Sequence, residues 1–320
     1  MVIKLRLQTI HPNPGPRTRD KTEEGRRERR ERRYAKRQEK RLTKQAKPSG
    51  FQNIITWNVQ RMPIGTRNSR KLKSVTDYIR KNKYDAALLS EVSSRDAGVT
   101  WLGENEDLTA IIYSKKAAIL LRGHMLRQWC EEGQTKKVDD RTISVKVGKT
   151  ILTSTYLPVW LGTNSDIIEN EREILKTHAS WAKSDETVII GGDFNAHIGS
   201  GEDRPGVCGK FGLRQTNHQG RELLDWMEEN RLCYVNSFSN HKRRGTWFNP
   251  ALRRWYELDG FMMRNHQRHK LVRKICTIGE SSLSDHLPKK LTVQITVDKK
   301  FNRPRKKPPP QDSMGKVAPG

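Results

Sequence analysis

The chain has 320 residues, of which 33 % are hydrophobic, and its 62 Lys and Arg against 36 Asp and Glu give a net charge of +26. This excess of positive charge favours a polyanionic partner, with nucleic acid first and an anionic membrane surface second. No apolar run reaches the roughly 18–20 residues of a membrane span, and no signal-peptide core is present. The four cysteines are scattered without a CxxC spacing. They predict reduced thiols in an intracellular protein and neither a zinc site nor a disulfide framework.

The two ends of the chain differ in composition from its middle. Residues 1–50 contain a long segment rich in Arg, Lys and Glu with almost no large apolar side chains. We therefore expect a basic, disordered or partly helical arm that contacts phosphates or directs nuclear import. Residues 299–320 are Pro-rich and basic and predict a disordered tail. A single domain over residues 51–298 is the economical interpretation of the rest.

Between these ends, apolar runs alternate with turn residues and amphipathic segments. Strands are predicted at residues 52–59, 84–92, 109–114, 143–147, 150–157, 186–194, 233–237, 256–263 and 291–297. Helices are predicted at residues 69–82, 166–183 and 219–230, the last with an apolar stripe of Leu223, Leu224, Met227 and Leu232. Many strands, few helices and long loops favour an α/β fold with two packed sheets and helices outside.

Polar residues recur at the ends of these apolar runs. They are Asn58, Glu91, Tyr156, Asp193, Asn195, Asp259, Asp285 and His286. Taken singly, such residues often do no more than close a strand, because Asn and Asp tolerate turn geometry. Taken together, they are the groups that metal-assisted phosphodiester cleavage requires. These are oxygen ligands for a hard divalent cation, a base for the attacking water, and donors for the developing negative charge.

Chemistry suggests roles within this set. Glu91 is the best candidate for a metal ligand, since it ends a strand that is otherwise apolar. Asp193 and Asn195, two residues apart, could supply a base and a donor from one loop. His286, if oriented by Asp259, could stabilise the same phosphoryl oxygens or the leaving group.

The stretch VIIGGDFNAHIG, residues 188–199, contains two further features. Gly191 and Gly192 directly precede Asp193, and we expect them to let another chain, here a DNA backbone, approach closely. His197 is interpreted as a loop residue without a catalytic role.

Seven motifs in the order of the chain carry a resemblance to a known superfamily. TWNV, LLSEV, STYLP, IGGDFNAHIG, GTWFNP, ELDGF and SDHLP resemble the exonuclease–endonuclease–phosphatase superfamily. They look most like the apurinic-type endonuclease domain of non-LTR, LINE-like retrotransposons and of genes derived from them. The resemblance covers about Ile54 to Val297. It implies a DNase I-like, four-layered α/β sandwich of two packed mixed β-sheets flanked by helices, with a site where the strand ends meet.

The resemblance also implies three groups of site residues. The metal ligands would be Glu91, Asn58 and Asp285. The catalytic residues would be Asp193 to activate water, Asn195 to position the phosphate, Tyr156 to contact it, and Asp259 paired with His286. The nucleic-acid contacts would be Thr246 and Trp247, extended by the preceding Arg243 and Arg244.

Two positions depart from the superfamily's usual pattern. Gln60 stands where repair relatives often have an acid, which removes one carboxylate from the metal site. Gly260 in ELDGF is expected to loosen the strand behind Asp259. Neither change deletes a core catalytic residue.

The sequence thus predicts a Mg²⁺-dependent endonuclease, with Mn²⁺ as the alternative cation, that nicks duplex DNA by activated water. RNA is the alternative partner, and no obligate protein partner is inferred. A reverse transcriptase signature is absent, so we expect a free-standing, element-derived enzyme in the nucleus. Two alternatives remain open. One is a non-catalytic nucleic-acid-binding protein on the same fold, and the other is a phosphatase or deadenylase of the superfamily.

Overall fold

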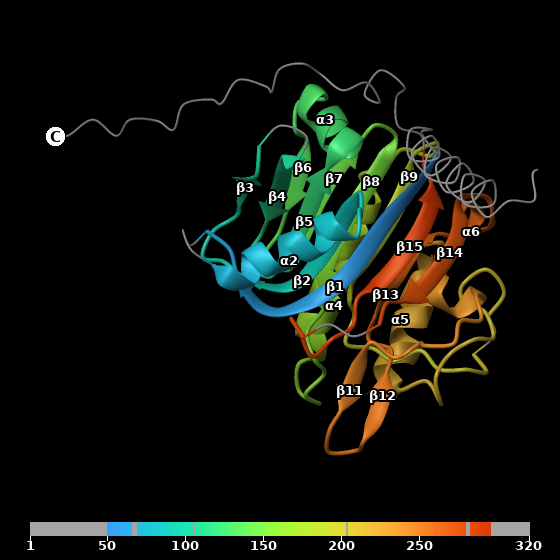
Figure 1. Cartoon of the computed structure of the whole chain (residues 1–320). Coiled ribbons are helices and arrows are strands. Elements are labelled where there is room, and N and C mark those ends of the chain that lie inside the picture. Colours follow the sequence, from blue (N-terminus) through green and yellow to red (C-terminus); the bar gives the residue numbers. More distant parts are fainter. Residues whose placement is uncertain (1–49, 66–68, 105–106, 203, 280–281, 296–320) are drawn as a thin grey trace, which may run out of the picture. The chain divides into compact units, whose positions relative to one another are not determined.

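The computed structural model describes residues 50–65, 69–104, 107–202, 204–279 and 282–295. The predicted N-terminal arm and C-terminal tail lie outside the described residues. Within them, two β-sheets pack face to face and helices lie on their outer faces (Figure 1). The predicted four-layered α/β sandwich is confirmed. None of the helices that the structure describes is long and apolar enough to cross a membrane.

The strands form two large mixed sheets and one hairpin. The seven-stranded sheet has the order β14 (Val272–Thr277), β15 (Lys289–Gln294), β1 (Phe51–Pro63), β2 (Ala86–Ser93), β5 (Ala117–Arg122), β4 (Thr109–Tyr113) and β3 (Gly98–Leu102). The six-stranded sheet has the order β10 (Leu232–Tyr234), β13 (Asp259–Arg264), β9 (Thr187–Asp193), β8 (Thr150–Tyr156), β7 (Thr142–Val147) and β6 (Lys136–Val138). The hairpin is β11 (Trp247–Asn249) with β12 (Arg254–Tyr256). Only β1–β2 and β8–β9 pair in parallel among the large-sheet strands described.

Helices cover both outer faces of the sandwich. The described helices are α2 (Arg70–Lys81), α3 (Gly123–Glu131), α4 (Ser165–Ala179), α5 (His218–Glu229), α6 (Asn265–Leu271) and the 3-10 turn η2 (Val235–Phe238), of which α3 packs on the core between the sheets. Helix α2 packs its apolar side on the seven-stranded sheet. Helices α4 and α5 pack on the six-stranded sheet.

The alternation of side chains along each strand divides the apolar residues between an inner and an outer core. On β9, Ile189 faces the other sheet, whereas Val188 and Ile190 face α4 and α5. Gly191 follows on the inner face, where an added Cβ would lie 2.7 Å from Leu88 Cδ1 of the opposite sheet. The glycine therefore lets the two sheets approach each other. The expectation that it admits a DNA backbone is wrong.

Most predicted elements that carry site residues are present with small shifts in their ends. The run at residues 233–237 is only briefly a strand, because β10 passes into η2 at Val235. Leu232 is buried but belongs to β10 and not to the stripe of α5. Several elements have no counterpart in the prediction, namely β3, β5, β6, β14, α3, α6 and the β11–β12 hairpin.

The carboxylate of Asp85, just before β2, is stabilised by one backbone bond and destabilised by burial. Its Oδ2 accepts from Asn53 N at 2.8 Å, yet burial raises the pKa of Asp85 to about 6. Because the folded state binds this proton more tightly than the unfolded state does, the proton stabilises the fold at acidic pH. This contribution to stability is lost when the pH rises through 6. We expect Asp85→Asn to raise the free energy of unfolding at pH 7 by about 2 kcal/mol, and to change little at pH 4.

Urea unfolding at both pH values measures this effect. Asp96→Asn, which neutralises an exposed carboxylate, serves as the control and should show no such pH dependence. Equal behaviour of the two variants would contradict the assignment to Asp85.

Candidate active site

Three site residues stand in one row across the six-stranded sheet. Tyr156, the last residue of β8, is opposite Asp193, the last residue of β9. Asp193 is in turn opposite Asp259, the first residue of β13. All three share the strand face of Ile189 and therefore point toward the other sheet. The row closes the inner core at one end.

The opposite sheet contributes Asn58 and Glu91 at the same end. Asn58 lies on the inner face of β1, two residues beyond Thr56. Simple alternation would turn Glu91 on β2 toward α2, because Leu89 faces that way. A bulge breaks the alternation. Residues 59–61 of β1 stand against Glu91 alone, and Gln60 and Glu91 have φ angles of +46° and +57°. The irregular backbone turns the Glu91 carboxylate back to the site.

Asn58 joins carboxylates from both sheets. Its Nδ2 donates to Glu91 Oε2 at 2.9 Å and to Asp193 Oδ2 at 2.8 Å. Its Oδ1 accepts from Gln60 N at 2.8 Å, which fixes the orientation of the amide. In this orientation Asn58 bridges two acids through its nitrogen. The geometry differs from the predicted role of an oxygen ligand to the metal.

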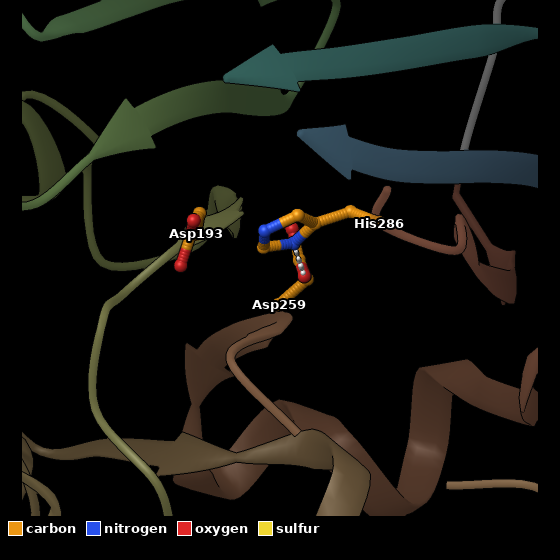
Figure 2. Close-up of side chains that lie close together, drawn as sticks. All are labelled: Asp193, Asp259 and His286. Carbon is orange, nitrogen blue, oxygen red and sulfur yellow. Dashed lines mark hydrogen bonds and ion pairs between the residues drawn. The ribbon is translucent and has the colours of Figure 1, made fainter. Parts of the chain in front are cut away.

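His286 lies between two buried carboxylates. Its Nδ1 is 2.7 Å from Asp259 Oδ2, and Figure 2 shows the other ring nitrogen directed toward Asp193. Trp57 Nε1 donates to His286 O at 2.9 Å. Ser284 Oγ donates to Asn58 O at 2.7 Å and accepts from His286 N at 3.1 Å. These bonds fix the His286 loop against β1.

Burial and neighbouring charges set the protonation of this group. Burial raises the pKa of Asp193 to about 7, with help from the charge of Asp259 and against the charge of His286. Burial alone would lower the pKa of His286, but the carboxylates of Asp259, Asp193 and Asp285 outweigh it and raise the value to about 9. At neutral pH the imidazole is therefore charged, and Asp193 holds a proton far more readily than an ordinary aspartate does.

Tyr156 and Asn195 flank Asp193. Burial, with the charges of Glu91 and Asp193, raises the pKa of Tyr156 to about 12, so its hydroxyl keeps its proton. Asn195 has a φ angle of +47°, its N–H donates to Asp193 Oδ1 at 3.0 Å, and its Nδ2 donates to Leu157 O at 2.7 Å. The turn after β9 thus orients the Asp193 carboxylate through its own backbone.

Two cations that sequence reasoning missed line the site. The Arg141 guanidinium lies 5.5 Å from the centre of the Tyr156 ring. The Lys71 ammonium donates to Gln60 O at 2.7 Å and interacts with the charges of Asp285 and Glu91. Arg141 lies in the turn between β6 and β7 and Lys71 is the second residue of α2, so neither had a local signal that set it apart from the many other basic residues.

Two of the predicted nucleic-acid contacts are wrong, because the structure buries them. Thr246 has no exposed surface, and its Oγ1 accepts from Leu258 N at 3.0 Å and from Asp259 N at 3.1 Å. Arg244 is 7 % exposed and its Nη1 lies 3.9 Å from Glu257 Oε2. Both side chains support the strand of Asp259 from inside the protein.

The other two predicted contacts are accessible. Arg243 is exposed and Trp247 is half-buried. Trp247 Nε1 donates to Asp285 Oδ2 at 3.3 Å, and its ring centre is 6.3 Å from that of His286. Trp247 thus forms one wall of the site.

Gly192, Gly260 and His197 have packing roles. A Cβ at Gly192 would lie 2.1 Å from Thr155 O, and one at Gly260 would lie 2.6 Å from Asn236 Nδ2. Gly260 therefore admits a close neighbour, and the expectation that it loosens the strand is wrong. The His197 ring is buried between Leu213 O and the N–H of Glu257.

The donor set suits a hard divalent cation. Ligand atoms of Asp193, Asp259 and His286 lie within 4.8 Å of one another. The carboxylates of Glu91 and Asp285 both interact with the one ammonium of Lys71. Carboxylate oxygens that converge on a positive charge are the ligand type that Mg²⁺ and Mn²⁺ prefer.

A family model matches residues 55–260 of the chain, and its description is endonuclease/exonuclease/phosphatase family. The chain belongs to the endonuclease/exonuclease/phosphatase family. The match includes the site residues of both sheets, which are Asn58, Glu91, Tyr156, Asp193, Asn195 and Asp259. Asp285 and His286 lie beyond it.

Individual proteins are similar over most of the chain. Craniofacial development protein 2 of Bos taurus is 27 % identical over 270 residues, which are 78 % of this chain and 43 % of the relative. The protein of the same name from Tragulus javanicus is also 27 % identical, over 78 % of this chain and 44 % of its own length. The chain thus spans less than half the length of these relatives.

One solved structure, the endonuclease domain of TRAS1, a telomere-specific non-LTR retrotransposon, is similar over 76 % of this chain and 98 % of its own. The TM-score is 0.47 and the sequence identity is 15 %.

The Thr246 hydroxyl accepts from one buried and one part-buried backbone N–H group, and this can be tested. Thr246→Val keeps the side-chain shape but leaves the N–H groups of Leu258 and Asp259 without an acceptor. We expect it to lower the free energy of unfolding by at least about 2 kcal/mol. Thr246→Ser keeps the hydroxyl and should lose only about 1 kcal/mol for the missing methyl group. If both variants unfold at the same urea concentration, the hydrogen-bonding role is wrong.

Proposed function

We propose that the protein is a divalent-metal-dependent DNA endonuclease that hydrolyses a phosphodiester bond with an activated water. The observation that carries the proposal is the junction of the two sheets. There Asn58 links Glu91 to Asp193, and Asp193 shares a buried cluster with Asp259 and His286. A candidate base (Asp193), a candidate acid (His286) and a candidate metal-binding carboxylate (Glu91) therefore lie together where the two sheets meet.

Asp193 is the proposed general base. A pKa of about 7 allows its carboxylate to accept a proton from water at neutral pH while remaining partly ionised. The N–H of Asn195 and the Asn58 amide hold both carboxylate oxygens in place. The base is therefore oriented before the substrate binds.

His286 is the proposed stabiliser of negative charge on the phosphoryl oxygens. It is cationic at neutral pH, and Asp259 fixes its ring through Nδ1. The free nitrogen faces Asp193 (Figure 2), so the imidazolium and the base act on the same space. The protonated hydroxyl of Tyr156 supplies a further donor from β8.

Glu91 and Asp285 are the residues proposed to hold Mg²⁺, with Mn²⁺ as the alternative. The bound cation would act as a Lewis acid that withdraws charge from the scissile phosphate. The hydrogen bond from the Asn58 amide holds the Glu91 carboxylate in place. Lys71 offsets part of the acid charge when no cation is bound.

The substrate proposed is duplex DNA, with RNA as the alternative. The net charge of +26 favours a polyanion bound through phosphates, with steep salt dependence. Beside the site, Arg141 and Lys71 supply partly accessible positive charge, and Arg243, four residues before Trp247, is exposed. Nuclear localisation remains a proposal from the sequence of the basic arm, which lies outside the described residues.

A plasmid-nicking assay tests the proposal. Wild type should convert supercoiled DNA to the nicked form with Mg²⁺ and not with EDTA. Asp193→Asn and His286→Gln should each nick on the order of 10²–10³-fold more slowly. Both should still bind DNA in EDTA, because neither side chain is needed to hold phosphates outside the site.

His218→Gln is the control, since His218 is an exposed histidine of α5 that pairs with Glu222 at 3.0 Å. It should nick like wild type. Binding without nicking by wild type would instead favour a non-catalytic nucleic-acid-binding protein. Equal rates in all four proteins would show that the catalytic residues lie elsewhere.

The metal assignment has its own test. Glu91→Gln keeps the hydrogen bond with the Asn58 amide but removes a negative charge. We expect the Mg²⁺ concentration for half-maximal nicking to rise on the order of 10- to 100-fold. Glu173→Gln, at an exposed position on α4, is the charge-matched control. An unchanged Mg²⁺ requirement in Glu91→Gln would exclude Glu91 as a ligand.

A further inference from the structure

Two ion pairs link the same two chain segments beside the site. One segment runs from Glu257 to Asp259 into β13, and the other runs from His286 to Lys289 into β15. Asp259 pairs with His286, and Glu257 pairs with Lys289 directly behind it. The side chains of Glu257 and Lys289 have no exposed surface, so they cannot meet the substrate.

We call Glu257–Lys289 the inner pair and Asp259–His286 the outer pair. Asn236 and Arg244 lie around the inner pair. Asn236 Nδ2 donates to Glu257 Oε1 at 3.0 Å and to Asp259 O at 3.2 Å. The Lys289 ammonium donates to Arg244 O at 3.1 Å, and the Arg244 guanidinium lies 3.9 Å from Glu257 Oε2. The Asn236 side chain thus attaches the backbone of Asp259 to the Glu257–Lys289 pair, and Arg244 braces that pair from another segment.

Stability alone is a weak reason for such a pair. Two charges that leave water lose solvation that their attraction only partly replaces, and apolar residues of similar size are often at least as stabilising. What an ion pair adds is a fixed distance between two segments. Here those segments carry Asp259 and His286.

We propose that the Glu257–Lys289 pair, with Asn236, is a positioning clamp that holds Asp259 and His286 at hydrogen-bonding distance. Glu257 and Lys289 are positioning residues, since they act through Asp259 and His286. The functional part of this inference rests on the role proposed above for His286.

The decisive variant is the double substitution Glu257→Gln/Lys289→Met, which replaces the ion pair by neutral side chains of similar size and leaves no unpaired charge. We expect kcat for nicking to fall about 10- to 100-fold, because a small displacement of a catalytic group costs that much, with KM for DNA unchanged. We also expect loss of the His286 Nδ1–H resonance from the proton NMR spectrum. When the hydrogen bond to Asp259 is weaker, the Nδ1 proton exchanges faster with water.

The matched control is Glu186→Gln/Lys146→Met. This pair is also formed by a lysine and a glutamate, with Lys146 Nζ 2.5 Å from Glu186 Oε1 and with Glu186 buried. It lies beside the first residue of β9, whereas Asp193 is the last residue of that strand. The control should keep the wild-type kcat and the His286 resonance. Wild-type values in the folded clamp variant would overturn the proposal. So would equal losses in the control, because these would indicate a general effect of losing an ion pair to a buried glutamate.

If the clamp variant fails to fold, Glu257→Asp decides. It keeps both charges and shortens the bridge by one methylene group, so kcat should still fall and the His286 resonance should still shift. A folded Glu257→Asp with wild-type values would overturn the clamp. If wild type does not nick DNA, the proposed function fails, while the His286 resonance still shows whether the inner pair holds the outer one.

Discussion

Side-chain alternation on packed sheets is the constraint on which the site depends. Asp193 shares the inner face of β9 with Ile189, and Asp259 shares the inner face of β13 with Phe261. Asn58 lies on the corresponding face of β1. A slip of one residue in any of these strands would turn its polar group to the outer face. The apolar residues that form the inner core therefore also aim the catalytic groups, and the site is the polar end of that core.

The sequence was sufficient to locate the acids and the histidine because each ends or precedes a run of apolar residues that forms a strand. It could not show where Glu91 points, since the bulge at residues 59–61 overrides alternation and has no proline or glycine to announce it. Residue type also misled at Arg244 and Thr246, which occur in a basic, loop-like stretch. Their burial depends on Glu257 and Asp259, whose proximity only the tertiary structure reveals.

The fold was predictable to a similar degree. Strands with mixed apolar and β-branched residues are predicted from the sequence, whereas β5, the run AAILLR, is not among the predicted strands. Helix α3 follows β5 at once, and its buried face depends on Trp129 packing between the sheets. Short elements at sheet edges, such as β6 and β3, have too few residues for periodicity to distinguish them from loops.

Neutral amides bridge some of the acidic groups beside the site, although Asp193 and Asp259 face each other directly across β9 and β13. Asn58 separates Glu91 from Asp193, and Asn236 stands between Glu257 and the Asp259 carbonyl. An amide donates two protons without adding charge, so it can hold two acceptors together where an ammonium would neutralise them. Burial and the charge of Asp259 raise the pKa of Asp193, and the hydrogen bond from the Asn58 amide offsets only part of that rise. A lysine in place of Asn58 would lower that pKa and weaken the base, although it would satisfy the same oxygens.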